Sequence, residues 1–183
     1  MTGPGLAVST PILAAMSRQD EIIAAFDRAH TDFMELVGGL TPEQWRTQGV
    51  NHPEIRLGPN DERRPVGVIA HHVAISYRAL RDRCSAWMRG EDPGMPPPDV
   101  NERHAAAYPE PDKADTMTLL DREADEVRRF VRNASDADLD AKGQWFRGET
   151  TAGQMLGETM PFHIGWHAGS IRASLEEPTA AGS

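Results

Sequence analysis

The sequence is poor in cysteine and in long apolar runs. Its single cysteine, Cys84, has no partner for an internal disulfide, so the chain fits a reducing compartment and a cytoplasmic location is expected. No window approaches the roughly 18 uninterrupted apolar residues that a membrane span needs. The first residues contain no basic segment and are interrupted by Pro4 and Pro11, which is not typical of a signal peptide.

Basic residues are also scarce. Nineteen Lys and Arg stand against 28 Asp and Glu, which gives a formal net charge of −9. An acidic surface repels nucleic-acid phosphates and anionic lipid headgroups, so we expect neither a nucleic acid nor a membrane as partner. The 183 residues are enough to form one domain with a core that needs no disulfides.

The pattern that is present is helical. Apolar residues recur at spacings of three and four in four stretches, each with a recognisable start or stop. These stretches run from Ser17 to Gly39, from Pro65 to Gly90, from about Asp115 to Arg132, and from Thr151 to about Leu175. The sequence therefore predicts an all-α fold, a four-helix bundle domain of residues 17–175 between tails of residues 1–16 and 176–183.

The connections between these stretches differ in length. Residues 91–112 are rich in proline and too long for a tight turn, so we expect a loop that covers a site or crosses the bundle. Such a long connection favours a crossover topology over simple up-down-up-down order. Short helical turns are expected after Thr41 and over Ser135–Leu139, and a brief extended piece near Gln144–Glu149.

Histidines are the candidate functional residues. His163 and His167 are four apart on the fourth helix, so they share a face and can bind one metal ion, although a hydrogen-bonded core pair has the same spacing. Ile164 replaces the glutamate of the HExxH zinc signature, which is therefore absent. A third ligand would be His71 or His72. Helix periodicity favours His72 as the inward residue and predicts His71 at the surface or in an interface.

Three passages carry a family pattern. The first helix ends in LVGGLTPEQW, the second begins with PVGVIAHHVA, and the fourth contains HIGWHAGSI. Together, over about Met16–Leu175, they resemble the DinB/YfiT-like superfamily of small four-helix metalloproteins. The resemblance implies that His72, His163 and His167 form a three-histidine metal site. Ser170 stands where the family commonly has glutamine, outside the ligand set.

The chemistry of such a site suggests an enzyme. Three neutral imidazoles leave a divalent ion an open position, as in catalytic zinc sites, and the expected ion is zinc or nickel, with iron as an alternative. The resemblance implies activation of a low-molecular-weight thiol of the mycothiol type, for S-transfer to an electrophilic substrate or for isomerisation. Tyr77 and Arg172 are candidate substrate contacts, although both residue types often serve in packing or at surfaces. The resemblance makes a homodimer a reasonable expectation.

Two alternatives to a thiol-dependent transferase or isomerase remain open. The first is hydrolysis by metal-bound hydroxide, which calls for a carboxylate base. Glu158 is a weak candidate for that base, because its position five residues before His163 turns it away from the ligand face. The second alternative is a non-catalytic ligand-binding or stress-response bundle whose metal is structural or absent.

Overall fold

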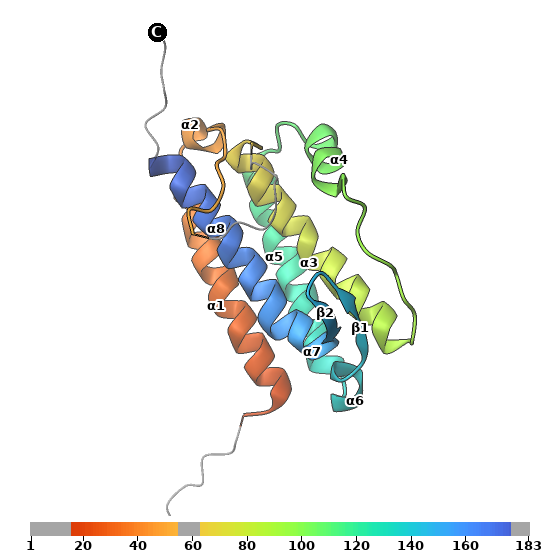
Figure 1. The fold of residues 1–183 in the computed structure, drawn as a ribbon. Helices are drawn as coiled ribbons and strands as arrows, with labels where there is room; N and C mark the ends of the chain where they lie inside the picture. The colour runs from red at the N-terminus through yellow and green to blue at the C-terminus, as the bar shows by residue number, and fades with distance from the viewer. Residues whose placement is uncertain (1–15, 55–62, 177–183) are drawn as a thin grey trace, which may run out of the picture.

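Four long helices form the bundle of the computed structural model, which describes residues 16–54 and 63–176 (Figure 1). They are α1 (Arg18–Gly38), α3 (Val66–Met88), α5 (Lys113–Asn133) and α8 (Met160–Glu176). Helices α5 and α8 each pack against both α1 and α3. The predicted all-α four-helix bundle is thus confirmed.

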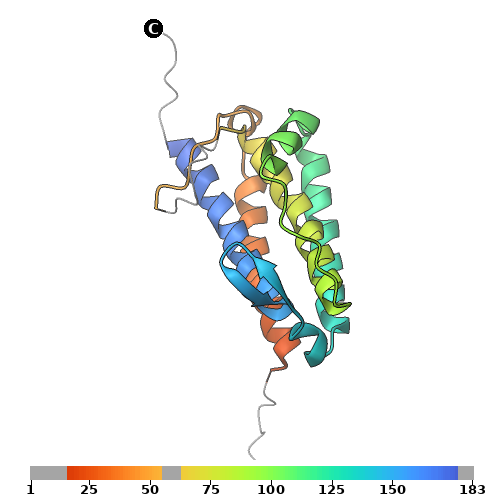
Figure 2. The same ribbon diagram turned by 45° about the vertical axis from the view of Figure 1, so that its right-hand side comes forward.

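The order of the helices includes a crossover. The colour gradient in Figures 1 and 2 shows that α3 and α5 run in the same direction, opposite to α1 and α8. The chain therefore returns along the outside of the bundle through residues 91–112 before α5 begins, as predicted. Because α3 and α8 are antiparallel neighbours, side chains from the second and the last bundle helix can meet between them.

Capping boxes start the helices where the sequence predicts them. The Ser17 hydroxyl accepts the backbone N–H of Asp20, whose carboxylate accepts the N–H of Ser17 at the start of α1. Thr41 and Gln44 make the same pair of bonds at the start of the short helix α2 (Pro42–Trp45).

The segment between α5 and α8 is more varied than the sequence predicts. It contains α6 (Asp136–Leu139), the antiparallel strands β1 (Lys142–Trp145) and β2 (Gly148–Thr151), α7 (Ala152–Gln154) and the π-helical turn η1 (Met155–Thr159). The expected extended piece is therefore a two-stranded hairpin. The fourth helix is predicted from Thr151, with Pro161 interrupting it. The structure has the π-helical turn η1, which ends two residues before Pro161, a residue with no N–H to donate to the helix.

The 91–112 connection contains a helix that the sequence analysis missed. Helix α4 (Val100–Ala107) has His104 as its one buried residue. The expectation of a loop is wrong for this stretch, because a helix with one buried side chain has no apolar period to detect.

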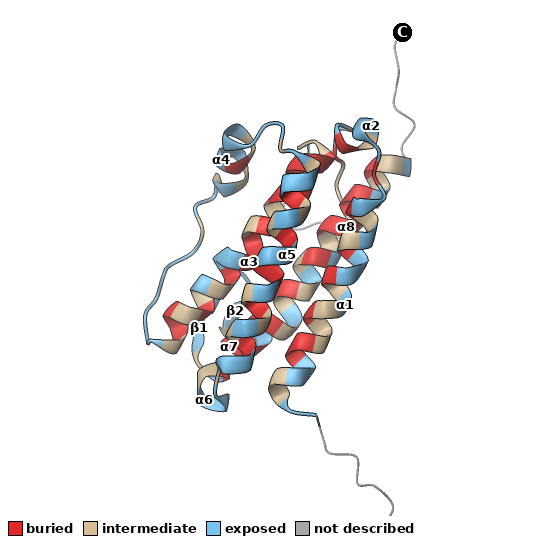
Figure 3. Cartoon of the chain, turned by 180° about the vertical axis from the view of Figure 1, so that it is seen from behind, coloured by how far each residue is buried: buried red, intermediate tan, exposed pale blue. Residues whose placement is uncertain are grey.

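The buried faces of the four long helices meet along the bundle axis, and exposed residues cover the outside (Figure 3). The largest fully buried apolar side chains are Tyr77, Phe26, Phe33, Ile69, Leu120, Leu139, Met155, Leu156, Met160, Ile164 and Ile171. Among the described residues, no helix has the length and apolar character that crossing a bilayer requires. The predicted tails lie outside the described residues except for Met16 and Glu176, and the domain bounds stay a prediction.

The start of α3 is held by an indole ring. Trp45 Nε1 donates to the carbonyl of Pro111 at 2.8 Å, and the ring lies against Gly67. A Cβ at Gly67 would come within 2.3 Å of Trp45 Nε1, so only glycine permits this contact. The contact joins α2, the end of the crossover connection and the first turn of α3, one turn before His72.

Candidate metal centre

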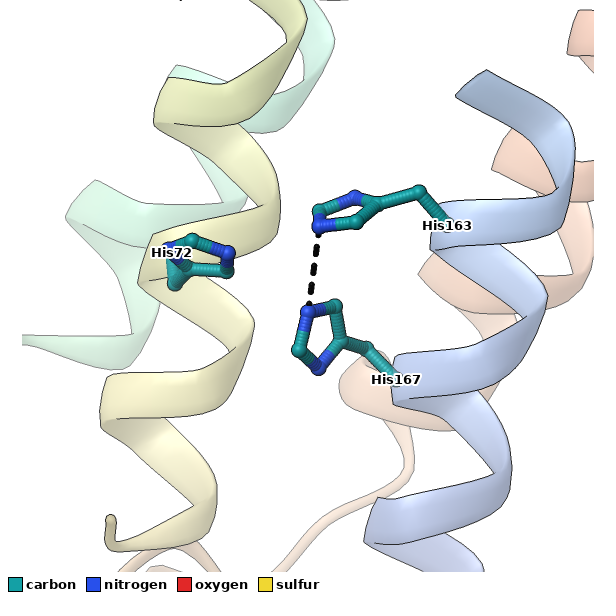
Figure 4. Close-up of side chains that lie close together, drawn as sticks. All are labelled: His72, His163 and His167. Atoms are coloured by element: carbon teal, nitrogen blue, oxygen red, sulfur yellow. Dashed lines mark hydrogen bonds between the residues drawn. The ribbon is translucent and has the colours of Figure 1, made fainter. Parts of the chain in front are cut away.

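Three imidazole rings converge between α3 and α8 (Figure 4). His72, His163 and His167 each offer one ring nitrogen, and these nitrogens all lie within 4.8 Å of one another. The Nε2 atoms of His163 and His167 are 3.2 Å apart, and the centroid of the His72 ring lies 5.4 Å and 5.0 Å from the centroids of His163 and His167. The structure therefore brings together the three residues that the sequence analysis selected.

The two adjacent histidines of α3 face different neighbours. His72 points toward α8, as helix periodicity predicts. His71, predicted at the surface or in an interface, is buried at 8% exposure and lies against His104 of α4. It is buried in an interface because α4 covers the side of α3 that the apolar stripe leaves open.

Burial makes the three rings poor bases. It lowers the pKa of His163 to about 4, with a further contribution from the charge of Arg64. Burial also lowers the pKa of His72 and of His167 well below the ordinary value, and the charge of His163 adds to this. No Asp or Glu of the described residues raises the pKa of these three groups. At pH 7 all three imidazoles are therefore neutral, the form in which histidine binds metals.

The polar groups behind the rings fit a metal site in part. The Ser76 hydroxyl donates to the carbonyl of Val73 at 2.7 Å and lies 3.4 Å from His163 Nδ1, whose proton it can accept. This places the lone pair of His163 on Nε2, the atom that faces His167. The Nδ1 atom of His167 is buried without a hydrogen-bond partner within residues 16–54 and 63–176. Two nitrogen ligands of a tetrahedral zinc ion lie about 3.3 Å apart, so the donor set and the spacing of the α8 pair fit a divalent ion.

The other predicted residues lie outside this cluster. Tyr77 is fully buried, and its hydroxyl lies 3.2 Å from Nδ1 of His30 on α1. Arg172 is exposed on α8, so substrate contact by Tyr77 or Arg172 stays a prediction. Glu158 is exposed and does not join the group of candidate metal ligands. Cys84 is buried with its pKa raised to about 12 by burial, as fits a core residue.

Sequence reasoning missed His104. Its ring contacts His72 edge-on, with centroids 5.5 Å apart, and its Nε2 lies 2.8 Å from His71 Nδ1. A single histidine in a proline-rich connection carries no periodic signal. A run of helix formers between Pro98 and Pro109 could have indicated the helix, but not the direction in which the histidine points.

A glycine on α8 makes room for a further histidine. A Cβ at Gly169 would lie 2.0 Å from Cδ2 of His52, so the His52 ring packs directly on the helix backbone. Gly165, one turn earlier, has nothing within 4 Å of that position. Close approach therefore explains the glycine at 169 and not the glycine at 165.

Comparison with known proteins agrees with this architecture. Residues 25–171 match the family model of the DinB superfamily. No protein with a curated description matches the chain. Solved structures of the same fold include YfiT from Bacillus subtilis, described as a probable metal-dependent hydrolase with an unusual four-helix bundle topology. YfiT is 17% identical, with a TM-score of 0.67 over 91% of each chain. An uncharacterised protein from Escherichia coli UTI89 is 14% identical, with a TM-score of 0.62 over 86% of this chain and 92% of that one.

Proposed function

The chain belongs to the DinB superfamily, and we propose that it is an enzyme that binds a divalent metal ion through His72, His163 and His167 and activates a small molecule there. The convergence of three neutral imidazoles from two helices carries this proposal. Taking three rings partly or wholly out of water is unfavourable, and an ion bound by their nitrogens would offset that cost.

An ion on three imidazoles keeps its charge and an open coordination position, and it acidifies a thiol or a water molecule that binds there. The chain supplies the surroundings. Helices α3 and α8 hold the rings on rigid backbone, the Ser76 hydroxyl orients His163, and burial keeps the imidazoles unprotonated. Zinc and nickel are the ions that we expect, with iron as an alternative.

We favour a low-molecular-weight thiol of the mycothiol type as the activated molecule, with an electrophile as the second substrate. In the described ranges, no carboxylate joins the cluster, and Glu158 is exposed. A thiol is intrinsically much more acidic than water, so a metal ion that binds it can ionise it without a neighbouring carboxylate base. S-transfer and thiol-dependent isomerisation both begin with such an ionised thiol.

Metal-dependent hydrolysis is the second candidate. The observation in its favour is the shared fold of this chain and YfiT, which is described as a probable metal-dependent hydrolase. Hydrolysis would require a base from a residue other than Glu158.

Metal analysis and two assays test the proposal. The protein is purified without added metal, and its zinc, nickel and iron contents are measured beside those of His163→Ala. We expect wild type to hold roughly one ion per chain and the variant almost none. The metal-loaded protein is then assayed for thiol conjugation to monochlorobimane and for hydrolysis of p-nitrophenyl acetate. Equal metal in wild type and variant would refute the three-histidine site, and esterase activity without conjugation would favour the hydrolase.

A further inference from the structure

Helix α4 meets the bundle through an imidazole. The helix lies beside the first half of α3 (Figure 2), and His104, at 6% exposure, is its one buried residue. The His104 ring contacts those of His71, His72 and Tyr108, with centroid separations of 5.1, 5.5 and 5.5 Å. An apolar side chain would fill this position with a smaller desolvation penalty, so the presence of an imidazole calls for another reason.

The two ring nitrogens of His104 differ in their partners. Nε2 lies 2.8 Å from Nδ1 of His71, which is hydrogen-bond distance. Nδ1 is buried and has no hydrogen-bond partner among the residues that the structure describes. Buried polar atoms are almost always paired, because an unpaired one loses its hydration without replacement. A buried nitrogen therefore stands without a partner on a ring that touches His72.

If His72 bound a metal ion, its outer ring nitrogen would carry a proton and would need a hydrogen-bond acceptor. One nitrogen of His72 would give its lone pair to the ion, so the other nitrogen carries the proton. Figure 4 shows one His72 nitrogen facing His163 and His167 and the other facing away from them. A metal-bound histidine almost always donates this outer N–H to a nearby acceptor, as His163 can to Ser76.

We propose that His104 is the positioning residue for the metal ligand His72, with His104 Nδ1 accepting the outer N–H of His72. The inference rests on the proposed metal site. The two rings already meet edge-on, with centroids 5.5 Å apart, and the proposed hydrogen bond would join His104 Nδ1 to the outer N–H of His72.

This assignment fixes which ring nitrogen donates and which accepts a hydrogen bond in His72, His104 and His71. A neutral imidazole has one donor and one acceptor, so His104 accepts at Nδ1 and donates from Nε2 to His71 Nδ1. His71 then carries its own proton on Nε2. His71 lines a surface cavity of about 310 Å³, where water can accept that proton's hydrogen bond.

Tyr108 offers a matched control beside the same rings. It follows α4 directly, and its ring stacks on His71 with centroids 4.3 Å apart. Its exposed fraction of 47% places much of it in solvent, and its hydroxyl takes no part in the proposed chain of hydrogen bonds. Tyr108→Phe therefore keeps the packing of α4 and should leave the metal site unchanged.

The first test compares metal binding in variants of the full chain. Zinc affinity is measured by competition with a chromophoric chelator, and Co²⁺ serves as a spectroscopic probe of the ligand field. His104→Phe keeps an aromatic ring and removes both nitrogens. We expect it to weaken zinc binding about 10- to 100-fold and to change the visible Co²⁺ spectrum. His104→Gln, which retains an acceptor oxygen, should recover most of the affinity. If the His104→Phe variant folds and keeps the zinc affinity and the Co²⁺ spectrum of wild type, His104 serves only in packing and the proposal is wrong.

The second test needs no substitution. Long-range ¹H–¹⁵N correlation spectra of the zinc-loaded protein report which nitrogen of each imidazole carries a proton. We expect an unprotonated Nδ1 and a protonated Nε2 on His104, together with a slowly exchanging outer N–H on His72. A proton on His104 Nδ1 would overturn the assignment even if His104→Phe does not fold. Zinc retained by His163→Ala would instead refute the metal site itself, so the two failures are distinguishable.

Discussion

His163 Nε2 lies 3.2 Å from His167 Nε2, one helical turn further along α8. Without an ion, one of these nitrogens carries a proton and donates a hydrogen bond to the other. With an ion, both present lone pairs at nearly the separation of two tetrahedral zinc ligands, about 3.3 Å. The arrangement of the α8 pair would therefore change little if zinc bound, and His72 on the facing helix would complete the proposed ligand set.

The adjacent histidines of α3 should differ sharply in their effect on metal binding. His72→Ala removes a ligand, so we expect zinc affinity to fall by more than the roughly 10- to 100-fold that loss of an outer partner causes. His71→Ala acts only through His104 and should have the smaller effect. Isothermal titration of chelator-treated proteins with zinc measures both. Equal losses of zinc affinity in the two variants would contradict the structure, in which His72 faces α8 and His71 faces α4.

The metal-free protein should lose stability as the pH falls below neutrality. Burial lowers the folded-state pKa of His30, His72, His104, His163 and His167 below the value of about 6.5 that histidine has in an unfolded chain. Between pH 6.5 and about 4 the unfolded chain therefore binds protons that the folded chain does not, and the free energy of unfolding decreases. Each unit of lowered pKa corresponds to about 1.4 kcal/mol.

Urea unfolding of chelator-treated protein at pH 7.5, 6.5 and 5.5 tests this dependence. The free energy of unfolding should be nearly constant above pH 7 and decline at 5.5. A constant value over the whole range would show that the histidines are not buried in neutral form.

Two glycines on α8 should respond oppositely to alanine. A Cβ at Gly169 would overlap the His52 ring, so Gly169→Ala should destabilise the protein by about 1–3 kcal/mol. A Cβ at Gly165 would meet no atom within 4 Å, so Gly165→Ala should stabilise the helix by up to about 1 kcal/mol. Thermal unfolding of the two variants side by side measures both effects. Destabilisation by Gly165→Ala would mean that something other than backbone preference retains that glycine.

Tyr77→Phe should affect stability and not metal binding. The substitution removes a hydroxyl that lies 3.2 Å from His30 Nδ1 in the core, at an expected loss of about 1 kcal/mol. Zinc content should equal that of wild type. Once an activity is in hand, a raised KM for this variant would support the predicted substrate contact, and an unchanged KM would remove it.

Features that depend on neighbours in the sequence could be predicted. The capping pairs Ser17–Asp20 and Thr41–Gln44 act within one helical turn, so residue type and spacing suffice to identify them. The choice of His72 over its neighbour followed from the apolar stripe of its own helix. His163 and His167 share a face through helix geometry alone.

Features that depend on a second segment could not be predicted. His71 is buried because α4 lies over it, and nothing in the α3 sequence indicates that cover. The pairing of Gly169 with His52 joins residues that are far apart in the chain. Pro161 indicated an interruption of the fourth helix, but the sequence carries no signal for its form, the π-helical turn η1.

The second and last bundle helices, which carry the three imidazoles, are connected through α4, α5 and the hairpin. An ion held by both helices closes that long loop, much as a disulfide would, but reversibly. The melting temperature should therefore follow the free concentration of the ion, with about 2.7 kcal/mol gained when that concentration is a hundred times the dissociation constant. Chelation would then loosen the bundle while every covalent bond stays intact.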